Sequence, residues 1–168
     1  IACQTENLTT KEPDLSFVNR VDSMDSDADV VVVFGGTNDF GHGDAKLGTF
    51  ESRDPYTFYG AMHVLCEKLI NRFPNADILF MTPLHRCSED EVSKENGLPE
   101  ETNLAGYVSI IREVAEFYGL PVLDLFSTSG LQPKVDIIKE TYMPDGLHPS
   151  DAGALRIALR LMGFLQTL

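Results

Sequence analysis

Two residues near the end of the chain have the types and spacing of an acid–base pair. Asp145 and His148 stand three positions apart, close enough to share one turn. In such a turn the carboxylate accepts the imidazole Nδ1–H, which fixes the tautomer and leaves Nε2 free to take a proton from a nucleophile. Gly146 permits a tight turn, and Pro149 disfavours the α region at the histidine. A purely structural polar turn, with Ser150 capping the next helix, is the alternative interpretation.

A second candidate group follows an apolar run in the early part of the chain. Residues 30–34 form a continuous β-branched and aromatic run, typical of a parallel strand covered on both faces. In open parallel sheets ligands bind beyond the carboxyl ends of the strands, where an Asn amide can donate to an oxyanion and glycine lets the backbone approach a substrate. We therefore expect Gly36, Thr37, Asn38 and Asp39 to lie near a substrate. A Gly-rich turn with Asn38 capping a helix is the alternative.

The elements that would position these groups are predicted from hydrophobic periodicity. Further strands are expected at 77–81 and 121–125, a short helix at 16–24 and a surface loop at 84–99. A helix capped by Asp54, with Pro55 in its first position, has one apolar face. The next helix ends at Gly119, and Ser150 caps a terminal helix. The apolar faces are Phe58, Met62, Leu65 and Leu69, then Leu104, Val108, Ile111 and Ala115, then Leu155, Leu159 and Met162. Strands alternating with helices predict a layered α/β fold with right-handed crossovers.

Taken together, the two polar groups resemble motifs of the SGNH (GDSL-type) hydrolases. Gly36-Thr37-Asn38-Asp39 is similar to the family's Gly-x-Asn-Asp block, and Asp145-Gly146-Leu147-His148 to its Asp-x-x-His block. The resemblance implies a flavodoxin-like three-layer α/β/α sandwich around a five-stranded parallel sheet. It also implies that Asn38 donates to the oxyanion, that His148 is the general base and that Asp145 orients it.

The family's nucleophile block, Gly-Asp-Ser, has no counterpart in this sequence. Asp22-Ser23-Met24 has Val21 where glycine is needed and follows a helical stretch, so Ser23 is not expected to be the nucleophile. The Gly block is not evident either, and the chain begins at Ile1 without an initiator Met. We therefore expect a single domain over residues 1–168 that is incomplete at its N-terminal side. The strand at 30–34 would then have an open apolar edge, to be completed by an upstream segment or by a second chain.

Composition excludes several classes of partner. The formal net charge of -13 disfavours nucleic acid and anionic membranes, and no apolar run is long enough to span a bilayer. The three cysteines are odd in number and lack metal-ligand spacing, which indicates a reducing, cytoplasmic setting, with secretion left open because an N-terminal segment is expected to be missing.

Other polar residues near the predicted site have weaker signals. His85 and Arg86 follow the second strand at the same sheet edge, and we expect them to face the substrate. His42 and Asp44 are better interpreted as a polar loop than as metal ligands. No metal or organic cofactor is expected.

The sequence thus predicts a serine ester hydrolase of small acyl esters, with the serine outside residues 1–168 and with those residues alone nearly inactive. A thioesterase or lysophospholipase with the same machinery is an alternative. A non-catalytic binding module that keeps the fold is the alternative from a different class.

Overall fold

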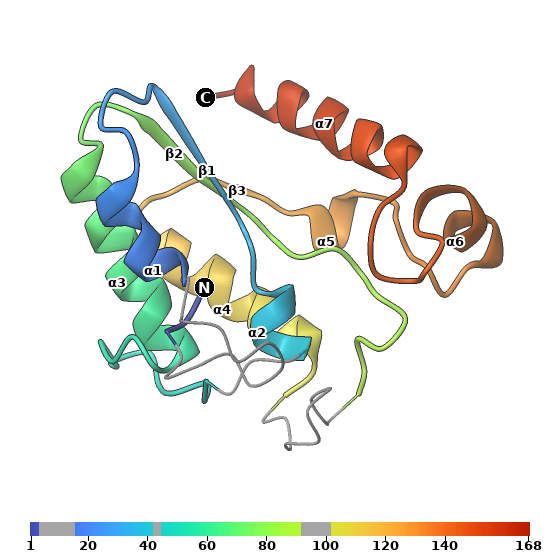
Figure 1. The fold of residues 1–168 in the computed structure, drawn as a ribbon, viewed down its shortest axis with the longest axis horizontal. Coiled ribbons are helices and arrows are strands. Elements are labelled where there is room, and N and C mark those ends of the chain that lie inside the picture. The colour runs from blue at the N-terminus through green and yellow to red at the C-terminus, as the bar shows by residue number, and fades with distance from the viewer. Residues whose placement is uncertain (4–15, 42–44, 92–101) are drawn as a thin grey trace.

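The computed structural model describes residues 1–3, 16–41, 45–91 and 102–168. Its sheet has the order β1-β2-β3, with β1 at Val30–Phe34, β2 at Asp77–Met81 and β3 at Val122–Leu123. All pairings are parallel (Figure 1). β1 and β2 pair residue by residue from Val30 opposite Asp77 to Phe34 opposite Met81. The α/β class and the parallel sheet predicted from the sequence are confirmed.

Helices connect the strands and cover both faces of the sheet (Figure 1). A single 3-10 turn, η1 (Val21–Ser23), follows the first of them. The α-helices are α1 (Phe17–Arg20), α2 (Thr37–Gly41), α3 (Phe58–Arg72), α4 (Leu104–Phe117), α5 (Leu125–Thr128), α6 (Asp136–Tyr142) and α7 (Asp151–Leu165). The short helices α5 and α6 were not predicted, and a helix at the place of α2 was only the alternative interpretation, because fewer than three turns leave little periodicity in a sequence.

One face of the sheet is closed by a continuous apolar core. Val31 and Val33 of β1 and Ile78 and Phe80 of β2 are buried there against α3 and α4. The apolar faces predicted for these two helices are all buried, and Gly119 follows α4 with a φ of 66°. The helix–sheet packing predicted from periodicity is therefore correct on this side.

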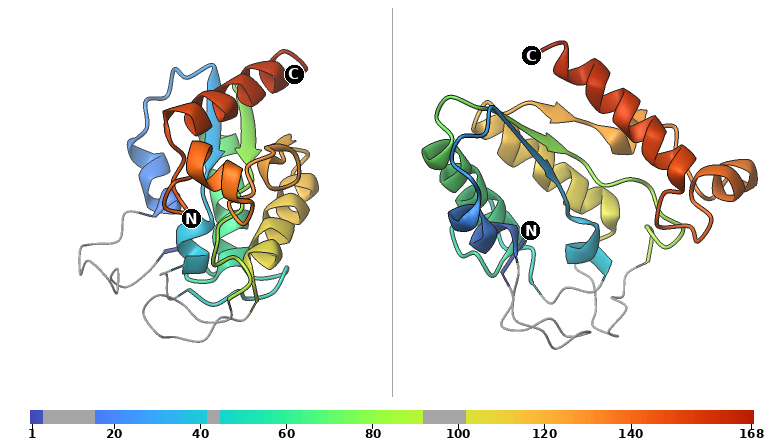
Figure 2. Two further views of the ribbon diagram at one scale, coloured as in Figure 1. Left: turned by 90° about the vertical axis from the view of Figure 1, so that its right-hand side faces the viewer. Right: turned by 45° about the horizontal axis from the view of Figure 1, so that its top comes forward.

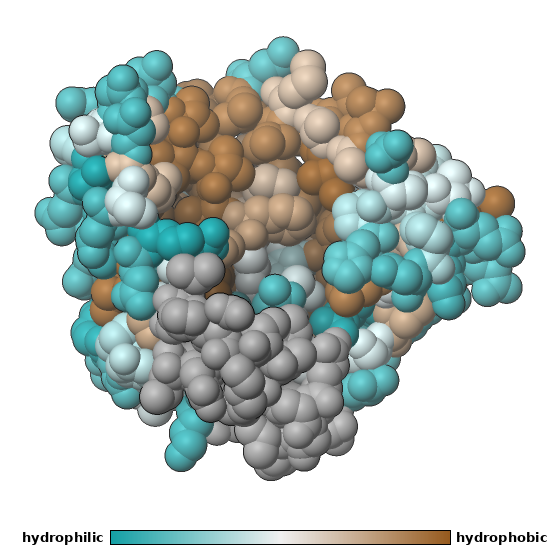
Figure 3. Space-filling view, in the orientation of Figure 1, coloured by the Kyte–Doolittle hydropathy of each residue, from teal (hydrophilic) through white to brown (hydrophobic). Residues whose placement is uncertain are grey.

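The opposite face is only half covered. Leu79 and Met81 of β2 pack against Ile157 and Leu161 of α7, which crosses this side of the sheet (Figure 2). Beside them on the same face, the side chains of β1 are open: Val32 is 39% exposed and Phe34 is 42% exposed. Figure 3 shows hydrophobic surface gathered over β1 and along α7, with a hollow between them.

The terminal helix differs from its predicted orientation. The predicted stripe of Leu155, Leu159 and Met162 is exposed, and the contacts with the sheet come from a second, partly buried apolar face around Ile157 and Leu161. Because α7 is apolar on two faces, periodicity alone does not say which one meets the sheet.

Two predicted boundaries were also wrong. Helix α3 begins at Phe58 with Thr57 as its N-cap, three residues later than predicted, because Asp54 forms a turn instead: its side chain accepts from the Tyr56 N–H and its carbonyl oxygen from the Thr57 N–H. Strand β3 stops at Leu123 because the Asp124 side chain accepts from the Ser127 N–H and starts α5. The helix predicted at 16–24 is present as α1 followed by the 3-10 turn η1.

Candidate active site

Asn38 is placed by the sharp turn that ends β1. Gly36 adopts a φ of 109°, and a Cβ there would lie 3.2 Å from both Ile111 Cδ1 and Pro83 Cγ, so only glycine fits without strain. The Gly36 carbonyl oxygen accepts from the Phe40 N–H, which opens the short helix α2. Asn38 stands in the first turn of α2 with its side chain exposed at the carboxyl end of the sheet.

Asp145 and His148 form the predicted acid–base pair. His148 Nδ1 lies 2.7 Å from Asp145 Oδ2, and Asp145 Oδ1 accepts from the main-chain N–H groups of Leu147 and His148 at 2.8 and 2.7 Å. The hydrogen bond to the His148 ring and these two N–H groups hold the pKa of the Asp145 carboxyl well below its ordinary value. The Asp145 carboxylate is therefore charged at neutral pH, with Oδ2 directed toward His148 Nδ1.

The turn that bears this pair is fixed from several directions. Gly146 has a φ of 78° and donates its N–H to the Met143 carbonyl oxygen at 2.8 Å, and its own carbonyl oxygen accepts from the Cys87 N–H at 2.9 Å. Ser150 accepts from the Gly153 N–H as the N-cap of α7 and donates its hydroxyl to the Thr141 carbonyl oxygen. The ends of α6 and α7 and the segment after β2 thus meet at this turn.

A pocket of about 280 Å³ brings the two predicted groups together. Asn38 and His148 both line it, with Thr37 beside Asn38. Apolar groups complete the wall: Phe34, Gly35, Pro83, Leu84, Leu147 and Pro149. The side chain of His148 is 76% exposed, so the imidazole can reach a ligand from solvent. An amide donor and a carboxylate-bound imidazole therefore converge on one cavity with a largely apolar wall, a combination suited to acyl transfer.

Sequence reasoning did not identify the apolar wall of this pocket. Pro83, Leu84 and Leu147 carry no chemical signal of their own, and each follows an element end where side-chain direction depends on tertiary packing. Their positions, two and three residues after β2 for Pro83 and Leu84 and inside the Asp-x-x-His motif for Leu147, were the available indications.

Two of the other predicted substrate neighbours lie outside the lining of this pocket. Gly36 is buried beneath it as the turn residue. Asp39 is buried, and its carboxylate accepts from the amino group of Ile1, the first residue of the sequence, and from the Ala2 N–H. Both residues are therefore buried next to the turn that carries Asn38 and do not line the pocket.

His85 and Arg86 lie at the same end of the sheet in a second polar cluster. His85 Nδ1 is 2.6 Å from Glu89 Oε2, and the imidazole ring stacks on Phe126 at 3.9 Å between centroids. Glu89 also accepts from Lys134 and Gln132. Burial alone would raise the pKa of the Glu89 carboxyl, but the hydrogen bonds from Lys134, His85 and Gln132 outweigh it and lower that pKa.

Arg86 is buried over the Phe40 ring, with the guanidinium carbon 5.4 Å from the ring centroid. It donates to Ser88 Oγ at 2.9 Å and, at 3.5 Å, to the carbonyl oxygen of Thr37. Arg86 thus contacts the turn that carries Asn38, and a direct contact of Arg86 or His85 with a substrate stays a prediction.

Ser23 ends the 3-10 turn after α1, and its hydroxyl donates to the Arg20 carbonyl oxygen at 2.9 Å, so its only described hydrogen bond is a local one. His42 and Asp44 lie outside the described residues. Within the described ranges, no cluster of three or more His, Cys, Asp or Glu side chains is arranged to hold a metal ion. Among the described helices, none combines the length and apolarity needed to cross a bilayer.

Comparison with known proteins identifies the class of hydrolase to which this fold and site correspond. Residues 5–156 match the GDSL-like lipase/acylhydrolase family, and the chain belongs to that family. The match includes both the Asn38 turn and the Asp145–His148 turn. The SGNH/GDSL resemblance predicted from these two motifs is thereby confirmed.

Solved structures agree with this assignment. A protein from Lactobacillus plantarum is 31% identical with a TM-score of 0.82, over 91% of this chain and 74% of that one. Another crystal structure is 39% identical with a TM-score of 0.80, over 91% of this chain and 71% of that one. The lipase/acylhydrolase from Enterococcus faecalis shares the fold at 20% identity and a TM-score of 0.62, over 89% of this chain and 68% of that one. No curated protein matches the sequence.

Proposed function

We propose that the protein is a serine ester hydrolase of small acyl esters, with His148 as general base, Asp145 as its orienting partner and Asn38 as an oxyanion donor. The convergence of Asn38 and His148 on one pocket carries this proposal. The family assignment supports it, since a lipase/acylhydrolase needs a base and an oxyanion donor around one acyl carbon.

The reaction follows from these roles. His148 Nε2 takes the proton of a serine hydroxyl as the serine oxygen bonds to the ester carbonyl carbon, and the Asn38 amide donates to the oxyanion that forms. The bond to the alcohol oxygen then breaks, and the departing alcohol takes the proton from His148. In the second half of the reaction, a water molecule gives its proton to His148 and attacks the acyl-serine, and the acid leaves as the serine oxygen takes that proton back. Asp145 stabilises the imidazolium in each half because its carboxylate stays charged.

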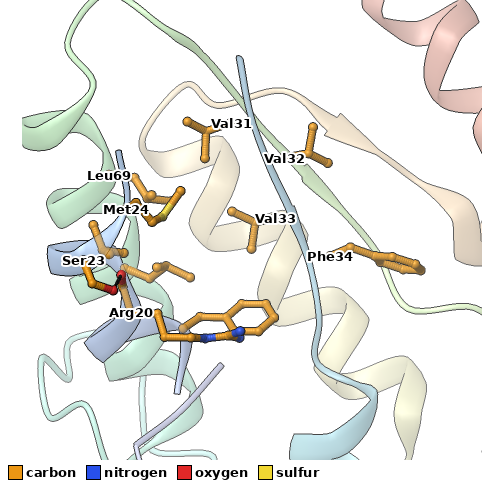
Figure 4. Close-up of a pocket in the computed structure, with 11 residues that line it drawn as sticks. Arg20, Ser23, Met24, Val31, Val32, Val33, Phe34 and Leu69 are labelled. Carbon is orange, nitrogen blue, oxygen red and sulfur yellow. Dashed lines mark hydrogen bonds between the residues drawn. The ribbon is translucent and has the colours of Figure 1, made fainter. Parts of the chain in front are cut away.

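The serine is proposed to come from a strand and helix that complete the sheet beside β1. Within the described residues β1 pairs only with β2, and a hollow of about 470 Å³ runs beside β1, lined by residues such as Arg20, Met24 and Leu69. Figure 4 shows Val31 and Val33 pointing toward Leu69 and Met24, and Val32 and Phe34 pointing the other way, to the open half of the face.

An added strand would pair with the free edge of β1, and a helix after it would cover both this open face and the exposed stripe of α7. A stable, soluble monomer of residues 1–168 with this surface open to water would contradict the idea. A segment of the same polypeptide and a second chain are the two sources to distinguish.

The central test uses the full-length protein and a p-nitrophenyl acetate-type ester. His148→Ala should lower turnover by several orders of magnitude, because the proton acceptor is lost. Asp145→Asn should also lower kcat strongly, and Asp136→Asn, at an exposed position on neighbouring α6, is the matched control. Hydrolysis by His148→Ala at the wild-type rate would refute the assignment.

Residues 1–168 alone should hydrolyse esters slowly or not at all. A fluorophosphonate probe should therefore label a serine of the full-length protein and none of the serines in residues 1–168. Labelling of Ser23 would overturn this view.

Thioester or lysophospholipid hydrolysis would use the same residues, so a substrate panel on the full-length protein decides between these acyl donors and carboxyl esters. A non-catalytic binding module would keep the pocket without turning over any of them.

A further inference from the structure

Asp39 is a buried carboxylate that the proposed reaction does not use. It follows Asn38 directly in α2, yet it is only 6% exposed and is absent from the residues lining the pocket. Burying a charged carboxylate is costly unless hydrogen bonds replace its water. The hydrogen-bond partners of Asp39 therefore indicate its role.

Those partners are main-chain groups far away in the sequence. Asp39 Oδ1 accepts from the Ala2 N–H at 2.8 Å, and the amino group of Ile1, the first residue of the sequence, lies 2.7 Å from Oδ2 and 3.0 Å from Oδ1. The Ala2 N–H is the main-chain amide donor to this buried carboxylate. The contact joins residues 37 and 38 positions apart and fixes one segment against the other.

The segment held in this way is part of the support of the pocket. Ile1, Ala2 and Cys3 are all buried, and the Cys3 N–H donates to the Pro55 carbonyl oxygen at 2.8 Å. A Cβ on Gly35 would lie 3.3 Å from Ile1 Cγ1, so the Ile1 side chain packs directly against Gly35. Gly35 lines the pocket three positions before Asn38.

Helix α2 needs such an anchor because it is short. Five residues do not form a stable helix without tertiary contacts. Phe40 supplies one contact, with its ring 5.9 Å from that of Tyr107 in a T-shaped arrangement. Arg86 supplies a second, through the Phe40 ring and the Thr37 carbonyl oxygen, and Asp39 supplies a third, toward Ile1 and Ala2. Asn38, which lies exposed between Thr37 and the buried side chains of Asp39 and Phe40, takes its position from them.

We propose that Asp39 is a positioning residue: by binding the main chain of Ile1 and Ala2, it fixes the turn of α2 that aims the Asn38 amide into the pocket. This role rests on the proposed esterase function. Asp39 acts through Asn38 and contacts no substrate. Its loss should affect the transition state, where the oxyanion forms, more than the binding of the ground-state ester.

The first experiment compares Asp39→Asn and Asp39→Ala with wild type in the full-length protein, per mole of folded enzyme. Asparagine keeps the shape and one acceptor oxygen, whereas alanine removes both acceptors. We expect kcat to fall about tenfold in Asp39→Asn and about a hundredfold in Asp39→Ala, with KM changed by less than about threefold. Asp25→Asn, an exposed change of the same charge, should leave both constants unchanged. Wild-type kcat in folded Asp39→Ala would overturn the proposal.

The second experiment does not depend on catalysis or on a variant that folds. In the wild-type full-length protein, NMR should show the Ala2 amide proton shifted downfield and protected from exchange, because it is bonded to a buried carboxylate. Rapid exchange at Ala2 would overturn the proposal. In Asp39→Asn the Ala2 signal and the Asn38 side-chain amide signals should both move, whereas a role confined to stability would leave the Asn38 amide in place. If the wild-type enzyme hydrolyses no ester, the proposed function fails, and these spectra still decide whether Asp39 holds Ala2 and Asn38 together.

Discussion

At the scale of single residues, the groups assigned to the reaction are exposed to solvent, whereas the charged groups next to them are buried. Asp145 remains ionised because the His148 ring and two main-chain N–H groups bind it, although its side chain is 53% exposed. Asn38 and His148 are exposed at the pocket, whereas Asp39 and Arg86 beneath them are buried. The groups assigned to chemistry are thus reachable from solvent, and the groups that orient them are packed in the protein.

Asn38 offers a direct test at this scale. Asn38→Ala in the full-length enzyme should lower kcat by about 10²–10³, since removal of one oxyanion donor costs that much in serine hydrolases, with little change in KM. The matched control is Asn71→Ala, an exposed asparagine near the end of α3 whose side chain donates to the Glu67 carbonyl oxygen. Steady-state kinetics would show equal kcat in Asn38→Ala and wild type if Asn38 only capped a turn.

At the scale of elements, the Asp145–His148 turn is confined by the segment that follows β2. Gly146 has a φ of 78°, and a Cβ there would lie 2.5 Å from Cys87 Sγ. The same two residues are joined by the hydrogen bond from the Cys87 N–H to the Gly146 carbonyl oxygen. The left-handed backbone and the close thiol both exclude a side chain, so this glycine is required by its surroundings as well as by the turn.

Gly146→Ala should destabilise the protein by about 1–2 kcal/mol from the backbone alone and should also lower kcat by displacing His148. Urea denaturation and ester kinetics measure the two effects. Gly163→Ala is the control, because that glycine lies in α7 with open space around its Cβ position, and alanine there should be neutral or slightly stabilising. Adding Cys87→Ala should relieve the contact with the thiol and leave the backbone strain. Unchanged stability in Gly146→Ala would show that the turn relaxes freely.

At the scale of the whole molecule, the two faces of the sheet differ in how completely they are closed. The α3–α4 face is a continuous core, and the α7 face covers β2 and β3 but leaves β1 open. The closed face also contains a buried polar group, His63, which packs among Phe50, Phe117 and Tyr118. His63 Nδ1 lies 3.1 Å from the Tyr118 hydroxyl oxygen, and that hydroxyl donates to Glu67.

This arrangement predicts a loss of stability on mild acidification. Burial, and then the charge of Arg53, lower the pKa of His63, and its Nε2 has no hydrogen-bond partner among the described residues. The unfolded chain, with an ordinary pKa near 6.5, therefore binds the proton first. The free energy of unfolding should be fully maintained above about pH 6.5 and fall below it, by at most about 1.4 kcal/mol per pH unit from this group.

Urea denaturation between about pH 7.5 and pH 5 checks this expectation, with His63→Gln as the comparison because glutamine does not titrate. The lowered pKa values of Asp124, Glu89 and Asp145 do not interfere. The stability that these carboxylates contribute is fully present above their pKa values in the unfolded chain, about 4, and is lost only at lower pH. Parallel pH profiles for wild type and His63→Gln would exclude the role of His63.

The sequence by itself determined the features that depend on residues close together in the chain. The Asp145–His148 hydrogen bond spans three residues, the strand at 30–34 is a local apolar run, and the faces of α3 and α4 follow a repeat of a few residues. Each of these was predicted correctly because the interacting atoms are fixed by backbone geometry within one or two turns.

Only the tertiary structure decided the contacts between distant segments. It brought Asn38 to the same pocket as His148, placed Ile1 and Ala2 against the Asp39 carboxylate, and turned the second apolar face of α7 to the sheet. It also moved the N-cap of α3 from Asp54 to Thr57. The physical reason is the same in each case: a local pattern allowed two or more arrangements of similar energy, and the packing of residues far apart in the chain selected one of them.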